Sequence, residues 1–247
     1  MRITLIFIFA ILLSLSILSC GDKGKQSKLL ITNIGVQSIS VPEPSGLDVT
    51  FDRTGFWTVS DESSLIYRLD NEGNVVQTIP VNGSDLEGIT VIDEQRIAVV
   101  LERDREVLIL DKEGNELQRK KLLLEGEANS GLEGITYNSN NGHFYILNEK
   151  KPSLLIELNE ELEILSIDTL NFSKDVSGIY YDNVNEHLWM LSDESQLIVK
   201  SDMNGVPLQS ISVDIVQPEG ISIDSKGKRL YIVSDNTESL YVYRINQ

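Results

Sequence analysis

Short apolar runs alternate with polar turns along almost all of the chain beyond residue 30. The pattern is clearest in one stretch, which contains GITVI (88–92), IAVVL (97–101), VLIL (107–110) and LQRKKLLL (117–124). Runs of about four to eight residues that are rich in Val, Ile and Leu and bounded by turn residues are typical of β-strands. The stretch therefore predicts four strands, and nothing beyond residue 20 has the length and spacing of an amphipathic helix.

This four-strand unit occurs five times. Each unit opens with a small or acidic residue, a glycine and an alternating apolar run: EPSGLDV (43–49), DLEGITV (85–91), GLEGITY (131–137), DVSGIYY (175–181) and QPEGISI (217–223). The glycines are spaced by 42, 46, 44 and 42 residues. A period of about 40–45 residues with several strands in each repeat indicates the blades of a β-propeller.

The fifth unit is incomplete, because its third strand (241–245) nearly reaches the C-terminus. The N-terminal sequence GVQSISVPEPSG (35–46) parallels GVPLQSISVDIVQPEG (205–220), which leads from the fourth unit into the fifth. We therefore expect residues 34–41 to supply the outer strand of the last blade, which closes the ring. The predicted fold class is all-β, a single five-bladed β-propeller of four-stranded blades. An open β-sandwich is the alternative, and the regular register of the repeats argues against it.

The repeats also predict a cluster of carboxylates. The first strand of a propeller blade lines the central channel, so Glu87, Glu133 and Glu219, which precede glycines, are expected at one mouth. The second strands end at the same face with polar residues 15 or 16 positions later, including Glu102 and Glu149. Crowded carboxylates repel one another unless protons or a cation compensate. Oxygen-only ligands in an irregular arrangement favour Ca²⁺. The alternative is an acidic mouth filled by water and sodium ions.

The N-terminus has the features of an export signal. Arg2 precedes an apolar run (3–18) that is short for a helix spanning a hydrocarbon core of about 30 Å. The run ends in ILSC (17–20), which resembles a bacterial lipobox and implies cleavage before Cys20 and a lipid anchor on that residue. The alternative is an uncleaved anchor in which Cys20 is incidental. The predicted organisation is a lipoprotein signal peptide (1–19), a polar tether (20–30) and the propeller (31–247).

Composition narrows the possible functions. The 21 basic and 38 acidic residues give a net charge of -17, which disfavours nucleic-acid binding. One cysteine excludes an internal disulfide and a thiolate zinc site. The serines that end second strands, Ser60, Ser192 and Ser234, have no histidine expected on their face, so no catalytic residue is predicted.

The openings EPSG, DLEGI, GLEGI, DVSG and QPEG, with SDE and NEK after the second strands, resemble the SdiA-regulated (YjiK-like) family of bacterial propellers. The resemblance covers residues 30–247 and implies an extracytoplasmic five-bladed propeller with a calcium site that the family shares. It also implies a distant similarity to NHL-repeat propellers, some of which are interaction modules, and it brings no enzymatic activity. The candidate metal ligands carried over from the resemblance are Glu87, Glu133 and Glu219, with weaker candidates on the same face: Glu102, Glu149, Asp175, Asp61, Asp193 and Asp235.

Two functions fit these observations. The first is a monomeric, calcium-stabilised, non-catalytic binding module of the cell envelope, which is tethered to a bacterial membrane by its N-terminal lipid. It would present its acidic face to a protein or small-molecule ligand. The second is a calcium-dependent hydrolase, a lactonase, esterase or phytase-like phosphoesterase, with Glu102 or Glu149 as the base. Few basic residues are available for a phosphate substrate, and this argues for the binding module.

Overall fold

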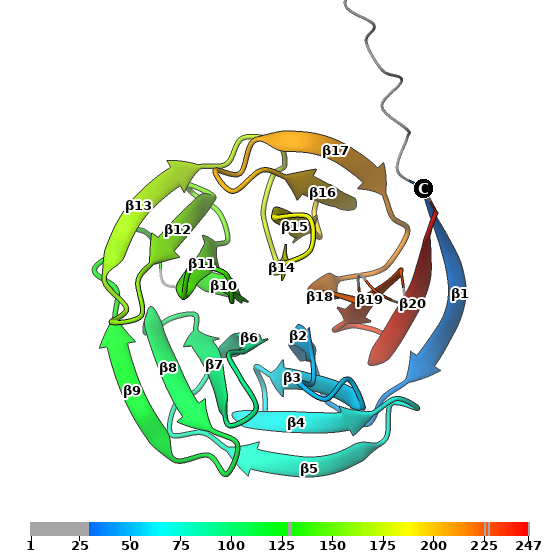
Figure 1. Ribbon diagram of the computed structural model, residues 1–247, viewed down its shortest axis with the longest axis horizontal. Coiled ribbons are helices and arrows are strands. Elements are labelled where there is room, and N and C mark those ends of the chain that lie inside the picture. Colours follow the sequence, from blue (N-terminus) through cyan, green and yellow to red (C-terminus); the bar gives the residue numbers. More distant parts are fainter. Residues whose placement is uncertain (1–29, 128–129, 225, 227, 247) are drawn as a thin grey trace, which may run out of the picture.

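The computed structural model describes residues 30–127, 130–224, 226 and 228–246. Five antiparallel sheets of four strands surround a central axis, which confirms the predicted five-bladed β-propeller (Figure 1). The predicted signal peptide, Cys20 and all of the tether except Leu30 lie outside the described residues. Within the described part of the chain, no helix is long and apolar enough to cross a membrane.

The strands follow one another from the axis outwards in each blade. Blade 1 contains β2 (Pro44–Val49), β3 (Gly55–Ser60), β4 (Leu65–Asp70) and β5 (Val75–Pro80). Blade 2 contains β6 (Leu86–Val91), β7 (Arg96–Leu101), β8 (Glu106–Asp111) and β9 (Glu116–Lys121). Blade 3 contains β10 (Leu132–Asn138), β11 (His143–Asn148), β12 (Leu154–Leu158) and β13 (Ile164–Thr169). Blade 4 contains β14 (Gly178–Asp182), β15 (His187–Ser192), β16 (Leu197–Ser201) and β17 (Pro207–Ser212). Blade 5 contains β18 (Pro218–Asp224), β19 (Arg229–Ser234), β20 (Ser239–Asn246) and β1 (Leu30–Ser38).

The N-terminal strand closes the ring, as predicted. β1 pairs antiparallel with β20 from Leu30 opposite Asn246 to Ser38 opposite Ser239, and the two strands lie side by side at the edge of the ring (Figure 1). The predicted bounds of this strand, 34–41, are wrong, because the strand begins four residues earlier and ends at Ser38.

The error has a simple origin in the alternating pattern of the strand. Ser38 lies opposite Ser239 in blade 5, as Ser212 lies opposite Leu197 in blade 4. Ser38 and Ser212 therefore correspond, and the shared letters QSIS suggest an alignment that is two residues out of step. A shift of two residues keeps every side chain on the same face of a strand, so the hydrophobic pattern cannot reveal it.

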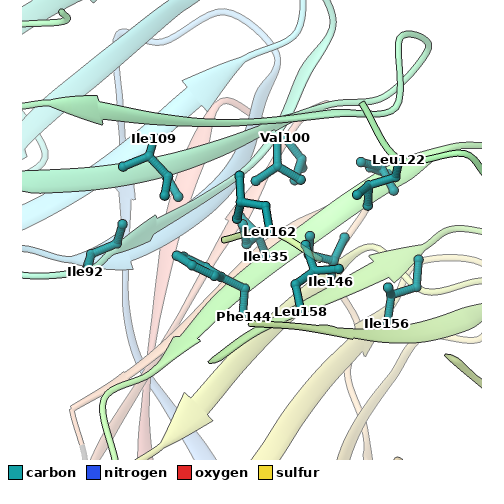
Figure 2. Close-up of a cluster of buried hydrophobic side chains, with 13 residues drawn as sticks. Ile92, Val100, Ile109, Leu122, Ile135, Phe144, Ile146, Ile156, Leu158 and Leu162 are labelled. Carbon is teal, nitrogen blue, oxygen red and sulfur yellow. The ribbon is translucent and has the colours of Figure 1, made fainter. Parts of the chain in front are cut away.

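Five apolar clusters hold the blades together, one at each junction between neighbours. The cluster between blades 2 and 3 contains Val100 and Ile109 from one blade and Phe144 and Ile146 from the next (Figure 2). Full burial of such a side chain contributes about 1.5–3 kcal/mol. Trp57 and Trp189 belong to the clusters between blades 1 and 2 and between blades 4 and 5.

The five repeated glycines are explained by the crowding of the inner strands around the axis. A Cβ atom on Gly220 would lie 2.4 Å from the backbone oxygen of Ser45 in the next blade, and one on Gly46 would lie 2.6 Å from the backbone nitrogen of Ile89. Gly88 and Gly178 face the backbone oxygens of Glu133 and Glu219 in the same way, at 2.9 Å and 2.5 Å. Only a residue without a side chain allows neighbouring inner strands to approach so closely.

Residues at successive positions relative to these glycines form successive layers along the central channel. The preceding residues face one mouth, and the residues two positions after each glycine approach the opposite mouth. Between the two layers lies an apolar plug formed by the residues that directly follow the glycines: Leu47, Ile89, Ile135, Ile179 and Ile221. The space left inside the plug is only about 10 Å³, so the two mouths are separate.

Candidate metal site at the acidic mouth

The residue before each glycine points into a cavity of about 170 Å³ at one mouth of the channel. These residues lie in the inner strand or, in blade 4, directly before it, so the ring geometry places all five around the axis: Ser45, Glu87, Glu133, Ser177 and Glu219. The ends of the second strands and the segments before the inner strands add further lining residues: Asp61, Glu149, Lys150, Asp175, Asp193, Glu194 and Asp235. The lining thus contains many carboxylates and a single basic side chain.

The three glutamates of the ring are strongly perturbed. Burial raises the pKa of Glu133 well above its usual range, and the charges of Glu87 and Glu219 raise it further. Burial is also the main reason why the pKa values of Glu87 and Glu219 are raised well above the usual range. The apolar plug directly beneath the glutamates excludes water on one side, which penalises their ionised forms. Without a compensating cation, the ionised ring is unfavourable.

Two groups of carboxylates lie close enough to share one ion. One oxygen from each of Asp85, Glu87 and Glu102 lies within 4.8 Å of the others, and the same holds for Glu102, Glu133 and Glu149. Glu102 belongs to both groups, and it accepts a hydrogen bond of 3.2 Å from the backbone N–H of Gly131. Burial, followed by the charge of Asp85, raises the pKa of Glu102 to about 7.

Lys150 is the internal counter-ion of the cavity. Its Nζ lies 2.6 Å from Glu149 and 3.4 Å from Glu194. The bond to Glu149 and the charges of both carboxylates raise the pKa of Lys150 above its usual range. One ammonium group therefore neutralises part of the cluster and holds the side chain of Glu149.

Asp175 lines the same cavity, but its carboxylate is already engaged. It accepts hydrogen bonds from the Ser192 hydroxyl and, at 3.1 Å and 3.2 Å, from the backbone N–H of Glu194. These bonds fix its orientation and tie the start of one inner strand to the end of the neighbouring second strand. Asp175 therefore has less free ligand capacity than the glutamates.

Asp61, at the end of the second strand of blade 1, lines the same cavity. Its Oδ1 is buried and has no hydrogen-bond partner. Burial and the charge of Glu43 raise the pKa of Asp61 to about 6. A buried carboxylate oxygen without a partner, in a lining rich in other carboxylates, matches the ligand preference of a hard divalent cation.

The structure brings most of the predicted ligands together. Glu87, Glu133, Glu219, Glu149 and Asp175 line one cavity, with Asp61, Asp193 and Asp235. Glu102 lies beside the cavity and within reach of Glu133 and Glu149. The sequence analysis missed Asp85, although the motif DLEG places it two residues before Glu87. It also missed the pairing of Lys150 with Glu149, which a run of unlike charges alone does not specify.

The opposite mouth contains a network of hydrogen bonds between neighbouring blades that the sequence analysis did not predict. Asp48 accepts four hydrogen bonds, from the backbone N–H groups of Val49 and Val91 (both 2.8 Å) and from the hydroxyls of Thr90 (3.1 Å) and Ser222 (3.2 Å). Asp48 thus links blades 1, 2 and 5. The hydroxyls of Thr90 and Thr136, at the matching positions of blades 2 and 3, accept from the backbone N–H groups of the following blades: Tyr137 (3.1 Å) and Tyr181 (2.9 Å).

A family model confirms the resemblance that the repeats suggest. The model of the SdiA-regulated family matches residues 26–244, which is most of the chain. The chain belongs to the SdiA-regulated family.

Solved structures show how widely the fold of this SdiA-regulated protein occurs. Glutaminyl cyclase of Myxococcus xanthus superposes with a TM-score of 0.69 at 12% identity, over 89% of this chain and 97% of that one. A chain of a nidogen/laminin complex superposes with a TM-score of 0.58 at 18% identity, over 81% of this chain and 74% of that one. Virginiamycin B lyase of Staphylococcus aureus superposes with a TM-score of 0.54 at 14% identity, over 81% of this chain and 66% of that one. Identities this low show a shared fold, and they leave the function of the SdiA-regulated protein to its own site.

Proposed function

We propose that this protein is a non-catalytic binding module whose acidic mouth binds calcium. An N-terminal lipid on Cys20 would tether it to a membrane of the bacterial cell envelope, and a protein or small-molecule ligand would bind at the acidic face. The observation that carries the proposal is the ring of Glu87, Glu133 and Glu219 over an apolar plug. Buried carboxylates of this kind are stable together when a divalent cation compensates their charge.

Calcium would be held by carboxylates from several blades. Glu102, Glu133 and Glu149 offer oxygens that are already close together, and Glu87 joins them through Glu102. These side chains come from blades 2 and 3, so bound calcium would stabilise the junction between those blades as well as the mouth. The chemistry supplied by the ion would be charge compensation, which keeps the glutamates ionised and fixed for recognition.

We expect calcium to stabilise the protein and chelation to remove the effect. At a free concentration about a hundredfold above Kd, a bound ligand adds about 2.7 kcal/mol, which for a domain of this size raises Tm by about 5–10 °C. Thermal unfolding in EDTA, in excess CaCl₂ and in excess MgCl₂ measures this, and isothermal titration calorimetry gives the stoichiometry. Equal Tm values in EDTA and calcium would contradict the proposal.

The variant Glu133→Gln separates a calcium site from a merely acidic surface. Removing one buried charge relieves repulsion from Glu87 and Glu219, so Tm in EDTA is expected to rise while the gain from calcium is lost. Glu161→Gln is the matched control, because Glu161 lies exposed outside the cavity lining. This control should keep the full calcium response. A lower Tm of Glu133→Gln in EDTA would show that the carboxylates are not repelling one another.

Lys150 is expected to compete with the ion. It lies in the same lining as the proposed ligands and occupies Glu149, so Lys150→Met should bind calcium more tightly. A unit charge and a divalent ion about 6 Å apart in water repel by about 1.4 kcal/mol, or about tenfold in Kd. Lys151→Met is the control, because Lys151 pairs outside the cavity with exposed Glu127 at 3.0 Å. Calorimetry that finds weaker calcium binding in Lys150→Met would refute the competition.

The alternative, a calcium-dependent hydrolase, has less support from the same cavity. Its lining contains no histidine, and its single basic side chain, Lys150, is paired with Glu149. Turnover of lactone, aryl ester or phytate panels in calcium, abolished by Glu133→Gln with the fold retained, would favour the hydrolase. Silence across the panels with calcium bound would favour the binding module.

A further inference from the structure

A second cavity lies between blades 1 and 2, at the face opposite the acidic mouth. Its volume of about 560 Å³ lies within the range of about 300–1,000 Å³ that is usual for small-molecule sites. It shares Thr50, Phe51 and Val91 with the smaller cavity above Asp48, so these residues lie where the two cavities meet. We refer to this cavity as the blade 1–2 groove.

Apolar and aromatic side chains line part of the groove. Trp57 and Ile97 belong to the apolar cluster between the two blades, and they line the groove with the small parts of their surfaces that stay exposed, 6% and 2%. Phe51 lines the groove and leaves 61% of its surface exposed, so it offers an aromatic face to a ligand. A flat apolar group that enters the groove would contact Trp57 and cover Phe51.

Basic side chains approach this apolar surface from both blades. Trp57 on β3 pairs with Arg68 on β4, and Arg68 pairs with Gln77 on β5, so the three form a row across blade 1. Gln77 donates a hydrogen bond of 3.2 Å to the backbone oxygen of Lys112 in blade 2, which joins the two walls. Among the described residues, Lys112 has no ion-pair partner for its ammonium group.

The acidic residues of the groove are mostly engaged. Asp93 pairs with Arg96 at 2.7 Å. Asp52 accepts hydrogen bonds from the hydroxyls of Thr50 (2.7 Å) and Thr54 (2.8 Å), and it lies 3.7 Å from Arg68. Glu94 is the remaining carboxylate. The groove therefore offers an uncommitted ammonium group and the guanidinium of Arg68 beside an apolar surface, on a chain whose net charge is -17.

We propose that the blade 1–2 groove binds a small amphipathic anion, an aromatic or similarly flat apolar group that carries one carboxylate or sulfonate. The apolar part lies against Trp57 and Phe51, and the anionic group lies between Lys112 and Arg68. Hydrogen bonds to charged groups are stronger than neutral ones, so the anionic group gives the site its selectivity. The acidic mouth repels the same ligand, so the two faces of the ring have opposite preferences.

A pair of matched probes tests the charge requirement. 1-Anilinonaphthalene-8-sulfonate carries a sulfonate, and N-phenyl-1-naphthylamine has the same rings without it. We expect the sulfonate to bind the purified full chain at least fivefold more tightly than the neutral probe, as measured by fluorescence titration. Energy transfer to the bound sulfonate should be greater in Trp189→Phe, which retains Trp57 in the groove, than in Trp57→Phe. Equal affinity for both probes, no binding, or greater transfer from Trp189 would overturn the proposal.

Charge variants locate the anion without changing the fold. Lys112→Ala and Arg68→Ala should each weaken sulfonate binding about fivefold and leave the neutral probe unaffected. Glu94→Gln should tighten sulfonate binding about twofold, because it removes the remaining acid. Lys200→Ala is the control, since Lys200 takes the place of Arg68 in blade 4, 5.7 Å from the ring of Trp189. A loss in Lys200→Ala equal to that in Lys112→Ala, or no loss in Lys112→Ala, would place the anion elsewhere.

Discussion

Replacing Gly220 with alanine is expected to lower the free energy of unfolding by about 3 kcal/mol, because overpacking against atoms that cannot move is costly. The new methyl group would lie 2.4 Å from the backbone oxygen of Ser45 and 2.7 Å from the backbone of Gly46 and Leu47. All three contacts are backbone atoms of blade 1, so no side-chain rotation relieves them. Blade 5 would have to move away from blade 1 at the junction where the ring closes. Urea unfolding followed by circular dichroism measures the loss.

Two other glycines provide the comparison. Gly134→Ala should cost less, because the nearest atom is the Cγ2 of Ile179 at 3.1 Å, which belongs to a side chain. Gly35→Ala on β1 should be nearly neutral, since nothing lies within 4 Å of the added atom. The expected order of stability is Gly35→Ala, then Gly134→Ala, then Gly220→Ala. If Gly220→Ala were as stable as Gly35→Ala, the close approach of the inner strands would be wrong.

Asp48→Ala is expected to cost about 3 kcal/mol at pH 5, because it leaves the part-buried backbone N–H of Val91 without a partner and opens a small cavity. The N–H of Val49 keeps a bond of 3.2 Å to the hydroxyl of Ser222. Thr136→Val is the matched comparison, since it removes a single acceptor, that of the Tyr181 N–H. Its cost should be about 1 kcal/mol. Equal costs would show that Asp48 does not link three blades.

The cost of Asp48→Ala is also expected to depend on pH. Burial raises the pKa of Asp48 to about 6, despite the four hydrogen bonds that lower it. A carboxyl group whose pKa is higher in the folded state stabilises the fold when protonated, and this stabilisation is lost as the pH rises through about 6. The difference in unfolding free energy between the wild type and Asp48→Ala should therefore be about 1 kcal/mol larger at pH 5 than at pH 8. Both proteins have the same acidic mouth, so its titration cancels, and a difference that grows with pH would contradict this assignment.

The fold was predictable from the sequence because its signals repeat. Five openings at similar spacing specify five blades, and the early end of the last repeat specifies closure by the N-terminal strand. The gathering of Glu87, Glu133 and Glu219 at one mouth follows from the same register. Strand ends were less predictable: the fourth strand of blade 2 was expected over 117–124 and ends at Lys121, because apolar residues continue past it as Leu122, which is buried, and Leu123, which is 91% exposed.

Other features depend on contacts between repeats and have no signal within one. In the sequence, Asp48 is an ordinary polar residue of a predicted strand. Only the closed ring of five blades brings Thr90 and Ser222 to its carboxylate oxygens. The glycines mark the repeats, but the reason for them, the backbone of the next blade, is a contact across the ring. The blade 1–2 groove is likewise formed by two sheets whose lining residues are 14 to 62 positions apart in the sequence.

The apolar side chains that fill the central channel determine whether ions and solutes can cross the molecule. Leu47, Ile89, Ile135, Ile179 and Ile221 leave about 10 Å³ between them, which is no more than the volume that one water molecule needs. An ion that enters from the acidic side must leave from that side, and a solute on the far side never meets it. Binding at one mouth could therefore affect the other mouth only if the sheets themselves shifted, because no ion or solute passes between them.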